Sequence, residues 1–273
     1  MASFVTGENT IKMVINFYDV ESHLKVFKKF EYLGPVYLKI LLFHIFTILI
    51  LFFQALLCKV ILKCSLVDLW PFLIFLINNM VIQKFATEIY VIILYVNKIT
   101  KEIKVFSKRC TEKSMEAINT LQTNQISNET NTLMRLYNNL SENSRISNNV
   151  IHLPMMTFLT ATFLMFILYM SFHINPVTWQ FTAFEVFFVT VGMTLNFLYA
   201  IIPSIVGEQL LRATEKLKTT LSKGCLQTTP GTPEYKQFLK FRQLVQDKPM
   251  RMLLGNVFDL DYTFLCSFTG SLA

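Results

Sequence analysis

Lys84 and Glu88 are two charged residues in a largely apolar stretch, residues 69–96, and their spacing allows them to pair. Because they are four residues apart, a helix would place the ammonium and the carboxylate on one face. Charged groups inside a membrane are costly and need a partner or a role. The sequence predicts a structural ion pair turned toward a helix bundle, with a ligand or ion pathway as the alternative.

Glu185 is a further acidic residue inside a second apolar stretch, residues 178–206, which contains no Lys or Arg. Its own helix therefore offers no basic partner. A ligand cavity, a neighbouring helix or water would have to satisfy the carboxylate. Pocket lining and pairing with a neighbouring helix are both open interpretations of this residue.

No arrangement of residues predicts catalysis or metal binding. The sequence lacks a phosphate-binding glycine loop, an HExxH motif and a nucleophile elbow. Asp259 and Asp261 are two residues apart, so they would not share a helix face, and we interpret them as interfacial residues. The cysteines and histidines show no ligand spacing: they are Cys58, Cys64, Cys110, Cys225, Cys266, His23, His44, His152 and His173. We therefore predict that the protein is not an enzyme and has no cofactor or metal.

The composition favours a membrane protein. Hydrophobic residues make up 53% of the 273 residues and charged residues only 16%, whereas a soluble domain has about 25% charged residues. The formal charge of +7 would suit nucleic acid if it gathered on one face, but it gathers beside apolar stretches. We attribute it to membrane topology and expect no nucleic-acid partner.

Four stretches have the roughly 20 mostly apolar residues that a transmembrane helix needs. They are residues 37–62, 69–96, 153–173 and 178–206. A fifth candidate begins near Met252 and runs to the C-terminus as an incomplete last transmembrane helix. Buried helices of a soluble protein are the alternative, but such helices are usually shorter.

Lys and Arg residues set the expected orientation. They are frequent in residues 1–36, 97–152 and 207–251, and nearly absent from the two short connections between the spans. Basic connections face the cytoplasm, so these three segments are predicted inside. The protein is then a multi-pass plasma-membrane protein with a cytoplasmic N-terminus and an extracellular C-terminus.

The predicted fold is an all-α integral membrane protein, a polytopic helical bundle with cytoplasmic helical extensions. Its parts are a cytoplasmic N-terminal segment (1–36), a bundle of four spans (37–206) with a cytoplasmic loop (97–152), a cytoplasmic helical hairpin (207–251) and the incomplete last span (252–273).

Leucine and aromatic spacing predicts helices within the cytoplasmic segments. Residues 131–149, 208–222 and 234–247 carry apolar side chains at helical spacing, and Thr232 is the expected cap of the last helix. Residues 111–130 are polar and Asn-rich, which indicates a loop, and a turn is expected at a cluster of Gly224, Pro230, Gly231 and Pro233. We expect the helices of the hairpin to pack under the membrane, with a basic calmodulin-binding or lipid-binding helix as the alternative.

Three stretches resemble the insect gustatory receptor family within the insect chemoreceptor superfamily. They are QKFATEIYVIILYVNKITKEI, LMRLYNNLSENSRISNNVIHLPMMTFL and FLKFRQLVQDKPMRMLLGNVFDLDYTFLCSFTGSLA. The last is the most specific; it contains Phe241, Gln243 and Leu244 and then the C-terminal motif Gly255, Phe258, Leu260 and Asp261. Long inner loops and very short outer loops also resemble this family.

The resemblance implies that the five spans correspond to family helices three to seven, so the chain looks truncated at both ends. The family's Thr-Tyr…Gln-Phe signature would follow Ala273. The family fold implies a homo- or hetero-tetramer embedded in membrane lipid, in which the last helix lines a cation pore. It also implies a pocket for a small-molecule tastant in the outer half of the bundle.

The residues here that reach the depth of that pocket are Gln54, Asn78, Asn79, Tyr169, His173, Trp179 and Glu185. Aromatic walls with a few polar groups suit small organic ligands. For Trp70, Tyr169 and Trp179, anchoring at the membrane interface is the alternative.

The expected function is thus that of a gustatory receptor subunit, a tastant-gated cation channel. A non-conducting truncated receptor fragment and an unrelated polytopic transporter are the alternatives. The transporter is disfavoured because no pair of broken helices recurs in two halves of the sequence.

Overall fold

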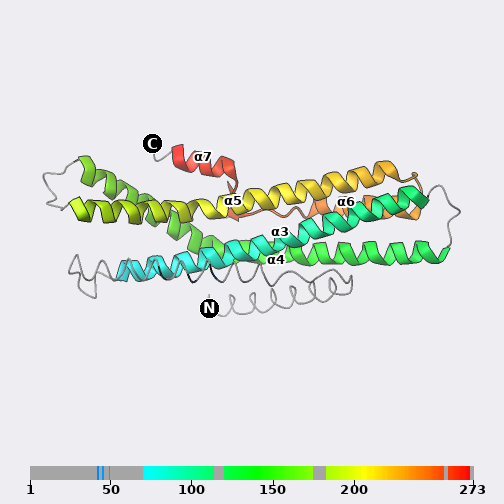
Figure 1. The fold of residues 1–273 in the computed structure, drawn as a ribbon, viewed down its shortest axis with the longest axis horizontal. Helices are drawn as coiled ribbons and strands as arrows, with labels where there is room; N and C mark the ends of the chain where they lie inside the picture. Colours follow the sequence, from blue (N-terminus) through cyan, green and yellow to red (C-terminus); the bar gives the residue numbers. More distant parts are fainter. Residues whose placement is uncertain are drawn as a thin grey trace. The chain divides into compact units, whose positions relative to one another are not determined.

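Long helices dominate the chain (Figure 1). The computed structural model describes residues 42, 45, 49, 70–113, 120–174, 183–254 and 258–270. The elements within these ranges are α3 (Trp70–Lys113), α4 (Thr120–Ile174), α5 (Ala183–Gln227), α6 (Pro233–Asp247), β1 (Leu253–Leu254), β2 (Phe258–Asp259) and α7 (Tyr262–Gly270).

Two compact units divide these elements, and each of the three long helices contributes to both. The described part of unit 1 comprises residues 89–113, 120–149 and 208–252; that of unit 2 comprises residues 70–88, 150–174, 183–207, 253–254 and 258–270. Unit 1 therefore contains α6, and unit 2 contains the two strands and α7.

Unit 1 has a core of large apolar side chains at helical spacing. Its nearly inaccessible residues include Ile92, Val96, Ile99 and Ile103 of α3, Leu133, Leu136, Tyr137 and Leu140 of α4, Leu210, Leu217 and Leu221 of α5, and Phe238, Phe241 and Val245 of α6. Positions three and four apart share a helix face, so each helix presents one apolar stripe to this core.

Two edge-to-face aromatic pairs fix α6 within unit 1. Phe238 meets Phe106 of α3 with ring centroids 5.5 Å apart, and Phe241 meets Tyr137 of α4 at 5.9 Å. This arrangement places the positive ring edge on the negative ring face. The α6 side chains thus bind α6 to two of the long helices, α3 and α4, while the predicted packing of the hairpin under the membrane stays a prediction.

Gly224 allows α5 and α6 to approach closely. A Cβ atom at this position would lie 2.9 Å from Cε1 of Phe238. Of the predicted turn cluster, only Gly224 was misplaced, because it belongs to α5, which continues to Gln227. The turn comes after Gln227 instead and includes Gly231, whose φ of +92° is in the region that favours glycine.

The predicted cap of α6 is confirmed. Thr232 has extended backbone angles, and its hydroxyl accepts a hydrogen bond from the amide of Tyr235 at 3.3 Å. Pro233 follows at the first helical position, where a missing N–H costs nothing.

The loop predicted over residues 111–130 is wrong wherever the structure describes it, because α3 continues to Lys113 and α4 begins at Thr120. The sequence there is rich in Asn, Ser and Thr, which are weaker helix formers. Packing decides the outcome: Thr130 is buried and continues the stripe formed by Leu133, Leu136 and Leu140. The helices predicted over 131–149 and 208–222 are confirmed within α4 and α5.

The four complete predicted spans fall on helices wherever the structure describes them. Residues 70–96 belong to α3, residues 153–173 to α4 and residues 183–206 to α5. Of the first predicted span, 37–62, only residues 42, 45 and 49 are described, and they are helical. Within the described ranges, one helical stretch, Met80–Cys110, is both long and apolar enough to cross a membrane.

The last span differs from its prediction. Instead of a helix from Met252, residues 253–254 and 258–259 form a two-stranded antiparallel sheet, with Leu253 opposite Asp259. The helix α7 begins only at Tyr262. The physical reason is Asp261, whose carboxylate accepts the amide of Phe264 at 2.8 Å and so caps the new helix.

Candidate functional site

The ion pair predicted from the spacing of Lys84 and Glu88 forms on α3 in unit 2. Nζ of Lys84 lies 3.9 Å from Oε1 of Glu88. The Lys84 side chain is 63% exposed and that of Glu88 only 18%, so the pair is not turned fully inward as expected. A long lysine side chain can cover apolar surface with its methylene groups while its ammonium reaches outward. The Glu88 carboxylate is therefore the more enclosed partner of the pair.

The residues expected to line a ligand pocket are placed only in part. Asn78 and Asn79 lie on α3, Tyr169 and His173 on α4, and Glu185 on α5. Their side chains, like Gln54 and Trp179 as whole residues, lie outside the described part of the chain. The pocket in the outer half of the bundle therefore stays a prediction.

Three buried polar side chains of unit 2 were missed by the sequence reasoning: Gln83 on α3, Thr162 on α4 and Ser204 on α5. They are 3%, 2% and 0% exposed, and within the described residues Nε2 of Gln83 and the hydroxyls of the other two have no hydrogen-bond partner. By contrast, the hydroxyl of Thr157 donates to the Leu153 carbonyl of its own helix at 3.1 Å.

An unsatisfied polar group in a dry interior is costly, so each of these three positions favours a water molecule or a polar group of a ligand. The signal that could have found them is modest. Gln83, Thr162 and Ser204 are polar residues inside predicted spans, and so is Thr157. Burial distinguishes the first three from Thr157, and burial is not visible in the sequence.

Of the C-terminal motif, Asp261 caps the start of α7. Leu260 is 1% exposed and Phe258 is 59% exposed, while Asp261 caps the helix. Gly255 lies outside the described residues. Asp259 and Asp261, interpreted from sequence as interfacial, have different structural roles, because Asp259 is part of β2.

Two ionisable groups of unit 1 are perturbed by burial. Desolvation raises the pKa of the Tyr137 hydroxyl, which donates a hydrogen bond to the carbonyl of Lys248 at 2.8 Å. Desolvation also raises the pKa of the Cys225 thiol, against a smaller opposite influence of the Arg242 charge. A neutral phenol and a neutral thiol suit structural roles. Among the described residues, no group of three or more His, Cys, Asp or Glu could hold a metal ion.

Comparison with known proteins identifies the family of the chain. The family model described as 7tm Chemosensory receptor matches residues 10–273. No curated protein sequence matches the chain. The family is one of helical membrane receptors and not one of enzymes, and the long helices of the structure agree with it. This protein belongs to the 7tm chemosensory receptor family.

Proposed function

We propose that the protein is a gustatory receptor subunit, a cation channel of the plasma membrane that a tastant opens. The observation that carries this proposal is the family match, which covers all but the first nine residues. The finer assignment to taste rests on the segment before α7, where Phe241, Gln243 and Leu244 precede the C-terminal motif. The chemosensory class itself follows from the family.

The proposed ligand is a small organic molecule held in the outer half of the bundle. Carboxylates inside a membrane are retained for a reason, so Glu185 is the polar group with the strongest claim to contact it. The other proposed contacts are Gln54, Asn78, Asn79, Tyr169, His173 and Trp179. Aromatic and amide side chains together provide the mixed lining that small ligands prefer.

The proposed assembly is a homo- or hetero-tetramer with the N-terminus inside and the C-terminus outside. Basic residues in the long connections support this orientation. Attachment of an epitope tag to each terminus, followed by antibody labelling of intact and permeabilised cells, measures it. Labelling of the N-terminal tag on intact cells would contradict the proposed topology.

Channel activity is tested by recording from excised membrane patches of cells that express the chain, during application of a tastant panel. A current that is carried by cations, evoked by a tastant and kept after excision supports the proposal, because soluble messengers are then absent. A cellular response that disappears on excision would instead indicate signalling without a channel in this protein and would overturn it.

The role of Glu185 is tested by Glu185→Gln, which removes the charge and keeps the size. We expect the half-maximal tastant concentration to rise by about tenfold, the cost of losing a charged hydrogen-bond partner. The matched control is Glu215→Gln on the same helix, α5, because Glu215 is exposed in unit 1. An equal shift in both variants would exclude a specific contact with Glu185.

A further inference from the structure

The extended segment that follows α6, residues 248–252, is held along α4 by side chains of that helix. We call it the connecting segment, because only nine residues separate Met252 from Tyr262, the first residue of α7. All of its contacts described below lie within unit 1. It has no helical or strand structure of its own between Lys248 and β1.

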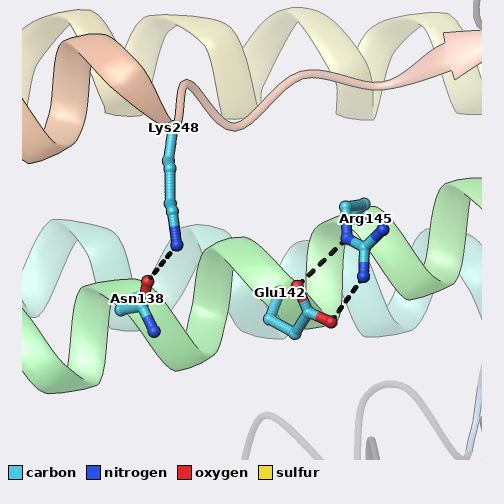
Figure 2. Close-up of polar contacts among 4 residues, drawn as sticks. All are labelled: Asn138, Glu142, Arg145 and Lys248. Carbon is cyan, nitrogen blue, oxygen red and sulfur yellow. Dashed lines mark hydrogen bonds and ion pairs between the residues drawn. The ribbon is translucent and has the colours of Figure 1, made fainter.

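Lys248 fixes the first end of the connecting segment through three different groups. Its amide donates to the Leu244 carbonyl at 3.0 Å and so closes α6. Its carbonyl accepts the Tyr137 hydroxyl at 2.8 Å and, more weakly, the Ser141 hydroxyl at 3.5 Å. Its ammonium donates to Oδ1 of Asn138 at 2.8 Å, as Figure 2 shows.

Asn148 fixes the other end. Its side-chain amide donates to the carbonyl of Arg251 at 2.7 Å. Asn148 lies eleven residues after Tyr137, which is three helical turns, so both belong to one face of α4. The connecting segment therefore runs in the same direction as α4, with one carbonyl held near each end.

Burial alternates from Pro249 to Met252 and sets the register of the connecting segment. Met250 and Met252 are 1% and 2% exposed, whereas Lys248, Pro249 and Arg251 are exposed. In an extended chain successive side chains point to opposite sides. A slip by one residue would bury Arg251 and expose both methionines, and it would break the bonds to Tyr137 and Asn148.

We propose that Tyr137 and Asn148 are positioning residues that hold the connecting segment in one register on α4, and that releasing this segment shifts the opening of the channel through α7. The second half rests on the proposed function, in which the last helix lines the pore. The physical ground is that the connecting segment is the covalent route from α6 to α7. Side chains of α4 bond its carbonyls near both ends, so these side chains help to set its position.

The first test measures hydrogen exchange at the amides of Met250, Arg251 and Met252 in the purified full chain. Tyr137→Phe keeps the ring that packs on Phe241 and removes only the hydroxyl. Asn148→Leu keeps the approximate size and removes the donor. We expect each variant to speed exchange in the connecting segment by about 2- to 10-fold, the range for one net hydrogen bond, and Asn148→Gln to restore protection.

The matched control is Arg145→Gln. Arg145 lies on the same stretch of α4, but it bonds Glu142 of its own helix at 2.7 Å (Figure 2). We expect no change in exchange of the connecting segment in this variant. Unchanged exchange in both Tyr137→Phe and Asn148→Leu, or an equal rise in the control, would overturn the positioning role whatever the channel does.

The second test records tastant-evoked current from the same variants. A shift of about 3- to 10-fold in the half-maximal tastant concentration or in the basal current, without one in Arg145→Gln, supports coupling to gating. Faster exchange with unchanged current overturns the coupling and leaves the positioning role standing. A tastant response of the wild-type chain that disappears on patch excision refutes the proposed function and with it the coupling, while exchange still decides the positioning role.

Discussion

The close approach of α5 to α6 at Gly224 predicts how Gly224→Ala changes the free energy of unfolding. The sign of that change depends on the neighbouring side chain of Phe238. In Gly224→Ala the new Cβ would lie 2.9, 3.0 and 3.2 Å from three ring atoms of Phe238. Ordinary contact begins at 3.4 Å, so the ring must retreat by 3.4 − 2.9 = 0.5 Å. Phe238 is 1% exposed and also packs on Phe106, so it has little room to do so.

Two opposing contributions set the magnitude. Replacing a glycine inside a helix by alanine stabilises by about 1 kcal/mol. Overpacking a well-filled core costs about 1–3 kcal/mol. The free energy of unfolding should therefore change little or fall by up to about 2 kcal/mol in Gly224→Ala. In a Phe238→Leu background the ring is gone, and the same substitution should stabilise by up to about 1 kcal/mol.

The assay is a double-mutant cycle read by pulsed alkylation of Cys225 with peptide mass spectrometry. Cys225 adjoins Gly224 and is 8% exposed, so its modification requires local opening of this packing. The cycle should give a coupling energy of at least about 1 kcal/mol between the two positions. If Gly224→Ala protects Cys225 equally in both backgrounds, the ring does not limit the approach of the helices, and the reasoning is refuted.

Three further predictions concern caps and titration. Thr232→Ala should cost about 1 kcal/mol and speed hydrogen exchange in the first turn of α6, whereas Thr232→Asp should preserve protection; equal exchange in both variants would rule out the cap. Asp261→Ala should lose about 1 kcal/mol and Asp261→Asn much less, measured by exchange at the first turn of α7, and equal losses would contradict capping by the side-chain oxygen. Because burial raises the pKa of Cys225, the unfolded chain loses this thiol proton at lower pH than the folded chain, so stability should fall as pH rises above the ordinary thiol pKa. Cys225→Ala should remove that part of the decline in the alkaline thermal-melting profile. An unchanged profile would exclude a contribution of this thiol to the decline.

Apolar periodicity was sufficient to predict most of the helical parts. The α6 helix and its Thr232 cap follow from local sequence signals, and so do the helices over 131–149 and 208–222. The first turns of α4 could not be predicted this way, because their Asn-rich sequence favours a loop. The burial of Thr130 beside the leucines, which the structure shows, is not visible in the sequence. Gly224 was expected to end the helix because glycine is a weak helix former. In the structure it lies inside α5, where the absence of a Cβ atom lets the ring of Phe238 pack closely.

The contacts of the candidate site were less accessible to sequence reasoning. The pairing of Lys84 with Glu88 follows from spacing alone. The bonds from Tyr137 and Asn148 to backbone carbonyls join residues more than 100 positions apart, and any residue has a carbonyl, so no residue type signals them. The late start of α7 likewise depends on a strand pairing of only two residues on each side, which is too short for a periodicity.

The length of α4 has a consequence for how the family sequence can vary. Its 55 residues rise about 80 Å, more than twice the roughly 30 Å of a bilayer's hydrocarbon core. Lipid can therefore cover less than half of one uninterrupted helix. In the topology that we propose, lipid covers the predicted span over residues 153–173, so the first half of α4 should accept Asn, Glu and Arg at outward positions that the last half should reject. The two halves of one helix are thus expected to lie in different surroundings. The position of a polar substitution along α4 should therefore predict whether the protein tolerates it better than the residue type does.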